Sequence, residues 1–217
     1  MAKNRFISFI ILIVAVAFTI YVVVDNLPVE EAEVTSGEGE GKVVNESEEG
    51  LGDAPFIAKD EVGLMSGMYA PDFTLPLWAI DKEMSLTDFR GEIVVLNLWA
   101  SWCPPCRDEM PDLIKLHEDY KDQGVKVLGI NMATLERSED ATEKFMDEYQ
   151  VTFPNFIDQP IDTFNQRGIV ESLYQVRAIP ATYILDQDGR IYIPIRGKVN
   201  YEMLENEVKK LLQLIER

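Results

Sequence analysis

Cys103 and Cys106 are the two cysteines of this 217-residue chain, and two prolines separate them. An apolar stretch typical of a buried strand ends just before them, and a helix-forming stretch begins at Pro104. Cys103 is therefore expected at a helix N-terminus, where free N–H groups and the helix dipole favour a thiolate. A thiolate attacks disulfides, and Cys106, one turn further and less exposed, would then resolve the mixed disulfide. The spacing predicts thiol–disulfide exchange through a redox-active disulfide between these residues.

Two other interpretations of the cysteine pair are a metal site and an inert structural bridge. The chain has one histidine, His117, so its cysteines cannot complete a four-ligand structural zinc site, and no metal is expected. A structural bridge over this spacing would close a very short loop and stabilise the fold little. The chain also shows no flavin or nucleotide motif, so we expect no cofactor.

Apolar periodicity predicts the elements that position the cysteines. The stretch 93–99 is almost continuously apolar, as in a central strand covered on both faces, and a helix is expected over 104–122. The stretch 125–130 is expected to form the next buried strand. Before them, apolar residues alternate with others over 73–77, which is typical of a half-buried strand.

The C-terminal half continues this alternation of helices and strands. Ser138 is expected to cap a helix with Ala141, Phe145 and Tyr149 on one face. Further elements are expected as a strand over 153–157, a helix over 169–174, strands over 182–186 and 190–195, and a last helix capped by Asn200. The inner face of that helix would consist of Leu204, Val208, Leu211, Leu212 and Ile215. Gln187-Asp188-Gly189 is a typical hairpin turn sequence between the last two expected strands. The whole pattern predicts an α/β domain with a mixed sheet and helices on both faces.

The N-terminus carries a predicted membrane anchor. The stretch 6–24 is a run of 19 residues, all but two of them apolar. At about 1.5 Å per residue this run spans roughly 28 Å, close to the hydrocarbon core of a bilayer. Lys3 and Arg5 precede it, so 1–5 is expected in the cytoplasm and the rest of the chain outside. No small-residue cleavage site follows the run, which favours an uncleaved signal-anchor over a cleaved signal peptide.

Acidic residues give the chain a net charge of −18, and they are concentrated after the predicted anchor. The stretch 25–55 holds ten acidic residues and one basic residue, Lys42. Such a segment buries too little apolar surface to offset its chain entropy, so we expect a disordered linker. The redox domain is then expected over 56–217. The negative charge also argues against nucleic acid as a partner, because phosphate binding needs a concentrated positive face.

Several segments of the chain are similar to those of a known family. The segment 99–106 resembles the active-site segment of the thioredoxin superfamily. The further similar segments are 70–75 with 86–91, which look like the opening β-hairpin of the TlpA/ResA-like branch, 133–157, which looks like the helix–strand insertion of that branch, and 176–182, which resembles the cis-proline loop. The resemblance covers 69–217. It implies a thioredoxin-like fold with an N-terminal β-hairpin and a central helix–strand insertion, preceded by one transmembrane helix.

The resemblance also implies roles for individual residues. Pro180 matches the cis-proline beside the nucleophile, which exposes the Ile179 backbone to pair with a substrate strand. Glu109 matches an acidic residue near the cysteine pair, where a carboxylate raises thiol pKa values and exchanges a proton with the resolving cysteine. The alternative for Glu109 is a solvated carboxylate favoured by the helix dipole. Trp102 would line the substrate groove, and Pro111 would kink the helix.

The chain departs from its better-known relatives in two places. Asn97 stands where thioredoxin has a buried Asp, so that acid–base role is missing or belongs to Glu109. Pro104 and Pro105 lack the His that stabilises the thiolate in strongly oxidising relatives, which favours a reductase. Trp99 is expected in the core, and His117 on the surface of the helix.

These features predict a membrane-anchored thiol-disulfide reductase on the outer face of a bacterial membrane. Its expected partners are protein disulfides, apocytochrome c first among them, and a membrane electron donor of the CcdA or DsbD kind. The alternatives are a disulfide oxidase, a reductase for other exported proteins such as those of the spore coat or cell wall, and a copper chaperone of the Sco type. The last needs a distal His ligand and usually a CxxxC spacing, and neither is apparent. A peroxiredoxin is disfavoured because Ala100 replaces the Thr three residues before the reactive cysteine.

Overall fold

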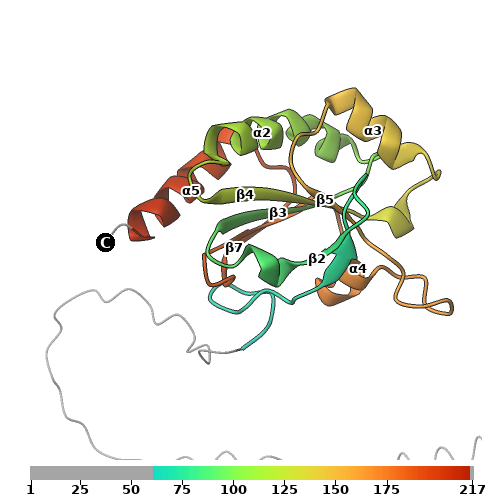
Figure 1. Cartoon of the computed structure of the whole chain (residues 1–217), viewed down its shortest axis with the longest axis horizontal. Helices are drawn as coiled ribbons and strands as arrows, with labels where there is room; N and C mark the ends of the chain where they lie inside the picture. The colour runs from blue at the N-terminus through green and yellow to red at the C-terminus, as the bar shows by residue number, and fades with distance from the viewer. Residues whose placement is uncertain (1–60, 216–217) are drawn as a thin grey trace, which may run out of the picture. The chain divides into compact units, whose positions relative to one another are not determined.

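A five-stranded mixed sheet forms the centre of the computed structural model, which describes residues 61–215 (Figure 1). The strands run in the order β5-β4-β3-β6-β7. Their bounds are β3 Ile93–Trp99, β4 Val125–Asn131, β5 Asn155–Ile157, β6 Ala181–Leu185 and β7 Ile191–Arg196. The first three are parallel to one another, while β6 is antiparallel to β3 and to β7. The mixed sheet expected from the sequence is confirmed.

Strand β3 is central because its side chains are apolar on both faces. All seven of its residues are buried. Val94, Leu96 and Leu98 point to one core cluster, whereas Val95 and Trp99 point to the other, as the two-residue period of a strand requires. In register, Asn97 lies opposite Gly129 of β4 and Thr182 of β6. A buried polar side chain thus lies in the middle of the sheet.

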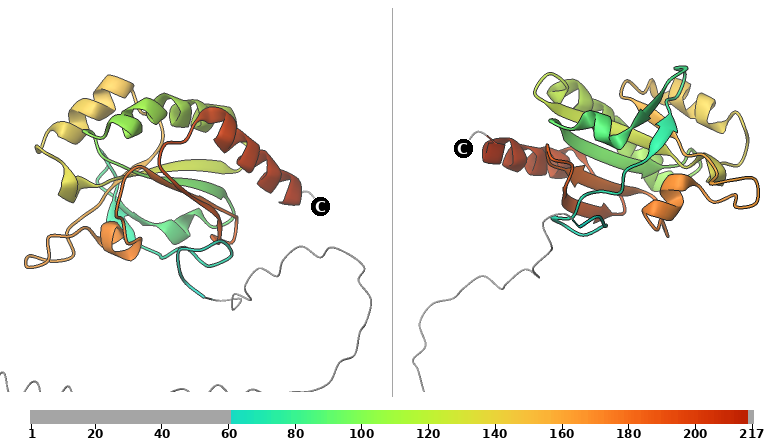
Figure 2. Two further views of the ribbon diagram at one scale, coloured as in Figure 1. Left: turned by 180° about the vertical axis from the view of Figure 1, so that it is seen from behind. Right: turned by 60° about the horizontal axis from the view of Figure 1, so that its bottom comes forward.

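Three helices cover one face of the sheet (Figures 1 and 2). They are α2 Pro104–Tyr120, α3 Ala141–Tyr149 and α5 Tyr201–Ile215. Their buried side chains include Met110 of α2, Phe145 of α3 and Val208 of α5, which pack in one cluster with Trp99. The Phe145 ring lies 4.4 Å from the Trp99 ring, centroid to centroid, so Trp99 is a core residue as expected.

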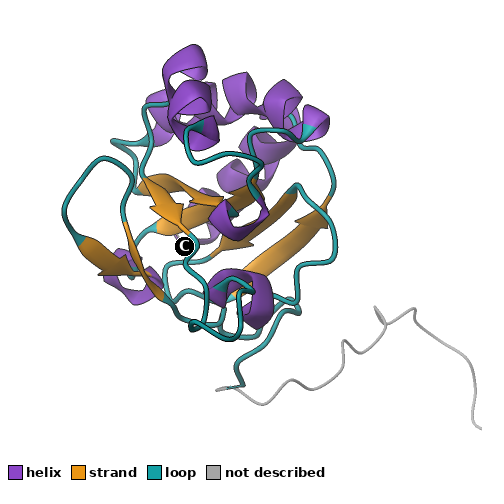
Figure 3. Ribbon diagram, turned by 90° about the vertical axis from the view of Figure 1, so that its right-hand side faces the viewer, coloured by secondary structure: helices purple, strands orange, loops and turns teal. Residues whose placement is uncertain are grey.

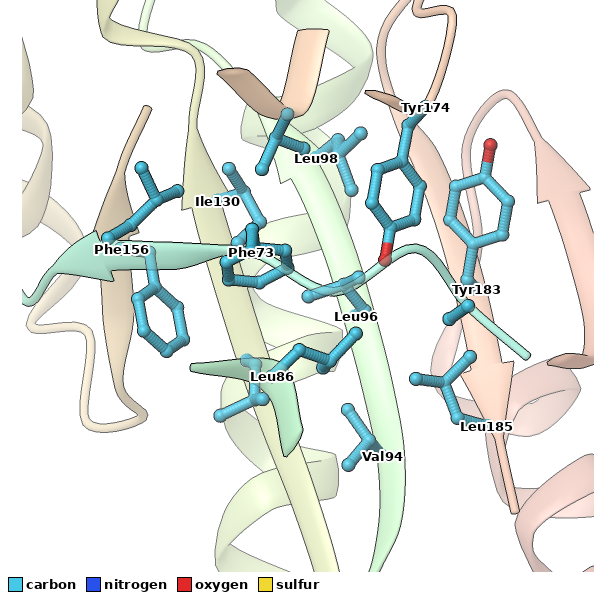
Figure 4. Packing of buried hydrophobic residues seen from close by; sticks show 14 of the residues in the cluster. Phe73, Leu86, Val94, Leu96, Leu98, Ile130, Phe156, Tyr174, Tyr183 and Leu185 are labelled. Atoms are coloured by element: carbon cyan, nitrogen blue, oxygen red, sulfur yellow. The ribbon is translucent and has the colours of Figure 1, made fainter. Parts of the chain in front are cut away.

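A short hairpin and a fourth helix cover the opposite face, so that the strands lie between helices (Figure 3). The hairpin pairs β1 Thr74–Pro76 with β2 Glu83–Ser85, and the 3₁₀ helix Leu86–Phe89 follows it. Helix α4 Ile169–Leu173 ends beside Tyr174, whose hydroxyl donates to the Pro71 carbonyl at 2.8 Å. Figure 4 shows how Phe73 and Leu86 of the hairpin region pack over the strands with Tyr174.

The predicted helix ends are partly confirmed. Asn200 caps α5, because its Oδ1 accepts the Met203 N–H at 2.9 Å. Ser138 was expected to cap α3, which is wrong: α3 begins at Ala141 after Asp140, and the Ser138 hydroxyl donates to the Asp140 carboxylate instead. The reason is that two residues, Glu139 and Asp140, separate Ser138 from the helix, so its side chain does not occupy the capping position.

The burial of two helical residues, His117 and Ile215, differs from the expectation. His117 is 9% exposed and packs edge-on against Phe153, so its expected surface position is wrong. Helix α2 is covered on that side by the segment before β5, which its own sequence does not reveal. Ile215 is 44% exposed, whereas Leu204, Val208 and Leu211 of α5 are buried as expected. The helix extends past the edge of the sheet (Figure 1), so Ile215 packs against neither apolar cluster of residues 61–215.

The predicted anchor over 6–24 and the predicted linker over 25–55 lie outside the described residues. Within 61–215, no helix is both long and apolar enough to cross a bilayer.

Candidate active site

The cysteine pair lies at the connection between strand β3 and helix α2. Strand β3 ends at Trp99, and α2 begins at Pro104, with Cys103 as its N-cap. The Cys103 sulfur accepts the Cys106 N–H at 3.3 Å, one of the free donors of the first helical turn. The two cysteines form a disulfide with their Cα atoms 5.3 Å apart. The N-terminal position expected from the sequence is therefore confirmed, and the structure holds the oxidised form.

Both cysteines are buried, which was expected for Cys106 but not for Cys103. Cys106 is completely buried, as expected for the inner cysteine. Cys103 was expected to be exposed, but only 2% of its surface is accessible, so that expectation is wrong. The Ile179 carbonyl oxygen lies 3.8 Å from the Cys103 sulfur and covers it from the side of β6. Cys103 nevertheless borders a groove on the protein surface.

This groove has a volume of about 460 Å³, within the usual range of ligand sites. Its walls come from the active-site turn, the segment after β4, α4 and the loop before β6. The residues that line it are Trp102, Cys103, Pro104, Pro105, Leu135, Glu171, Val176, Arg177, Ala178 and Ile179. The structure thus brings Trp102 and Ile179, both predicted from the sequence, to the same groove as Cys103.

The loop before β6 lies beside the disulfide because β6 is the neighbour of β3 in the sheet. The Ile179–Pro180 peptide bond is cis, as the resemblance implied. Pro180 itself is buried, and its carbonyl accepts the Gly197 N–H at 3.0 Å from the turn after β7. The loop is therefore fixed between the cysteine turn and the end of β7.

Glu109 is completely buried, one helical turn after Cys106 on the inner side of α2. Of the two expectations, the position near the cysteine pair is confirmed, and the solvated carboxylate is wrong. Glu109 Oε1 accepts from Asn97 Nδ2 at 2.8 Å, and Oε2 accepts the Val199 N–H at 2.9 Å. Burial raises the pKa of Glu109 to about 7, although these two hydrogen bonds oppose the shift. The carboxyl group therefore changes charge near neutral pH.

Asn97 connects Glu109 to the sheet. Its Nδ2 also donates to Thr182 Oγ1 at 3.1 Å, so both amide hydrogens are used. Its Oδ1 is buried and accepts no hydrogen bond from the described residues. The amide thus acts towards Glu109 purely as a donor, which favours the charged form of that carboxyl group.

Glu136 supports the cysteine turn and was not predicted. Its Oε1 accepts the Ser101 N–H at 2.7 Å, and its Oε2 accepts from the Ser101 hydroxyl at 2.6 Å. Nearby, Trp102 Nε1 donates to the Leu135 carbonyl at 2.8 Å. The segment 135–136 therefore holds the two residues that precede Cys103. No spacing in the sequence marks this role, because the two segments meet only through the pairing of β3 with β4.

Comparison with known proteins agrees with this geometry. Residues 67–193 match the AhpC/TSA family. The thioredoxin-like protein YneN of Bacillus subtilis is 42% identical over 134 residues, which are 62% of this chain and 73% of the relative. The thiol-disulfide oxidoreductase ResA of Oceanobacillus iheyensis is 35% identical over 142 residues, which are 64% of this chain and 69% of the relative.

A solved structure shows the same architecture. The thioredoxin domain of a thiol-disulfide oxidoreductase from Bacteroides vulgatus superposes with a TM-score of 0.58 at 26% identity, covering 69% of this chain and 99% of that one. The chain therefore belongs to the AhpC/TSA family and is a thioredoxin-like thiol-disulfide oxidoreductase of the ResA-like type.

Proposed function

We propose that this protein is an extracytoplasmic, membrane-anchored reductase of protein disulfides, with apocytochrome c as its substrate. The buried Glu109, one turn from Cys106 and with a pKa of about 7, carries this proposal. A carboxylate held there raises thiol pKa values and destabilises a thiolate on Cys106. Destabilised thiolates favour the disulfide form, so the reduced protein readily gives up its electrons.

The exchange begins with the reduced protein. The Cys103 thiolate attacks one sulfur of the substrate disulfide, forms a mixed disulfide and expels the other substrate sulfur as a thiolate. Cys106 then attacks the Cys103 sulfur, forms the disulfide seen in this structure and expels the second substrate thiolate. Two electrons pass to the substrate, whose two thiolates take up protons.

Glu109 serves the second step. The Cys106 thiol must lose its proton before it attacks, and it is shut off from water. Residues three apart on a helix are neighbours, so Glu109 lies within reach of Cys106 and accepts this proton. Because the pKa of Glu109 is about 7, both its protonated and charged forms are populated at neutral pH. Glu109 therefore accepts the Cys106 proton when the disulfide forms and returns it when the disulfide is reduced again.

The groove fits a protein substrate. Trp102 and Ile179 flank Cys103 on two walls, so an extended segment in the groove places its disulfide against the Cys103 sulfur. Outside the cytoplasm, oxidation of nearby cysteines is the rule. Covalent haem attachment requires both thiols of a C-x-x-C-H segment free, so an oxidised apocytochrome c needs such a reductase.

Two features of the sequence support the proposed location and electron donor. The apolar run 6–24 and its cationic flank support an anchor with the redox domain outside. Since the chain has no flavin or nucleotide motif, the oxidised protein takes its electrons from a membrane thiol protein of the CcdA or DsbD kind. The acidic stretch 25–55 supplies the distance between membrane and domain.

The reduction potential of the full-length protein tests the direction of the reaction. A value near about −270 mV, as in thioredoxin, supports a reductase, whereas a value near about −120 mV would identify an oxidase. For the substrate, deletion of the gene should lower mature c-type cytochrome, and an added dithiol should restore it. If a deletion strain that encodes no second copy of this domain has normal cytochrome c, apocytochrome c is not the substrate. The protein would then be a reductase for other exported proteins.

A further inference from the structure

Two arginines at the groove have no carboxylate partner among residues 61–215. Arg177 lines the groove and is exposed. The Arg137 guanidinium, also exposed, lies 4.7 Å from the ring centroid of Trp102, which lines the groove as well. Arg177 belongs to the loop before β6 and lines the groove, whereas Arg137 follows β4 and lies next to the groove through its contact with Trp102.

The one carboxylate that lines the groove is already satisfied. Glu171 Oε1 accepts from Arg167 Nε at 2.9 Å. Its Oε2 accepts the Gly168 N–H at 3.2 Å and the Thr134 hydroxyl at 3.4 Å. Glu171 therefore does not compensate Arg137 or Arg177.

This positive charge contrasts with the rest of the protein. The chain carries a net charge of −18, and several cations of the described domain are paired with carboxylates, as Arg107 is with Glu148 and Lys198 with Asp108. In so acidic a protein, surplus carboxylates are available to neutralise a surface arginine. Two guanidinium groups at the groove, neither with a carboxylate partner among residues 61–215, thus leave binding capacity for an external anion.

We propose that Arg137 and Arg177 select disulfides whose flanking residues are acidic. This inference rests on the proposed function, because it assumes that a protein disulfide occupies the groove. An extended segment advances about 3.3 Å per residue, so carboxylates within about three residues of the attacked cysteine stay within the groove region. Guanidinium groups bind carboxylates through two parallel hydrogen bonds, which suits an Asp or Glu on either side of the substrate cysteine. The arginines are positioning residues for substrate and take no part in sulfur exchange.

Single-turnover reduction of two matched peptides tests the proposal. Both peptides contain one disulfide, flanked by glutamates in the first and by glutamines in the second. The full-length reduced protein in detergent is mixed with each peptide at low salt, and the rate constant is followed by tryptophan fluorescence. We expect the wild type to reduce the glutamate peptide about tenfold faster than the glutamine peptide, with the preference shrinking at high salt.

Variants show which residues cause the preference for the glutamate peptide. The double variant Arg137→Gln, Arg177→Gln should lose most of this tenfold ratio. Lys82→Gln should keep it, because Lys82 is an exposed cation on the turn between β1 and β2 and does not line the groove. Equal rates for both peptides in the wild type would overturn the selection while leaving the reductase intact. An equal loss on both peptides in the double variant would also overturn it, since the arginines would then act through the cysteines. Failure of the wild type to reduce either peptide would refute the proposed function itself.

Discussion

Glu109→Gln removes one buried charge and leaves the shape of the side chain unchanged. In the oxidised protein the cysteines do not titrate, because both sulfurs are in the disulfide. The pH dependence that Glu109 adds to stability can therefore be separated from that of the thiols. The pKa of Glu109 rises from 4.5, its ordinary value, to about 7 because the group is buried.

The direction in which stability changes with pH follows from proton binding to Glu109. Between pH 4.5 and 7 the folded protein holds a proton on Glu109 that the unfolded chain has lost, so the free energy of unfolding falls as pH rises. The stabilisation is complete below pH 4.5 and is lost once pH passes 7. A shift of this size corresponds to about 3 kcal/mol, since one pKa unit is worth about 1.4 kcal/mol.

Urea unfolding of the oxidised full-length protein in detergent measures this effect. All three tryptophans, Trp78, Trp99 and Trp102, lie in the described domain, so their fluorescence reports its unfolding. The difference in unfolding free energy between wild type and Glu109→Gln should change by about 3 kcal/mol between pH 4.5 and pH 8. Any constant cost of placing an amide beside Val199 cancels in this comparison. A difference that stays the same at both pH values would refute the elevated pKa and, with it, the proton transfer to Cys106.

Further substitutions test other parts of the molecule. Cys106→Ser should trap stable mixed disulfides on Cys103, seen by non-reducing electrophoresis; exchange that survives Cys103→Ser would reverse the two roles. Asp158→Ala should destabilise the protein by about 2 kcal/mol in urea, because the buried carboxylate accepts two N–H groups at the start of α4, at 2.9 and 3.0 Å. A loss below about 0.5 kcal/mol would show that this cap is dispensable. Phe145→Ala should cost about 3 kcal/mol by circular dichroism, since it opens a cavity beside Trp99; an unchanged midpoint would exclude a tight core there.

Local patterns predicted the elements and the position of the cysteine pair well. The apolar run 93–99 forms a strand with all of its residues buried, and the helix after it begins at Pro104. Both features depend on neighbours along the chain: six of the seven β3 side chains are apolar, and prolines occupy the first turn of α2. The cis bond before Pro180 came from the family resemblance instead, because a proline by itself does not reveal its isomer.

Burial of a side chain by segments distant in sequence could not be predicted from local patterns. His117 and Cys103 are both covered by residues far away in sequence: Phe153 packs on the first, and the Ile179 carbonyl lies against the second. Glu136 meets Ser101 only after β3 and β4 have paired. In each case the covering group is fixed by the sheet order, which the periodicity of one segment does not contain.

Asn97 and Glu109 show how these distant contacts determine the chemistry. Two buried carboxyl groups at these positions would repel each other, and one of them would stay protonated well above neutral pH. The amide of Asn97 instead donates to Glu109 at 2.8 Å, and the Val199 N–H donates to it at 2.9 Å from 90 residues further along the chain. These donors oppose the effect of burial and hold the pKa at about 7 rather than higher. With an amide at position 97, Glu109 is the one carboxyl group in this hydrogen-bonded cluster among residues 61–215, as the proposed proton transfer from Cys106 requires.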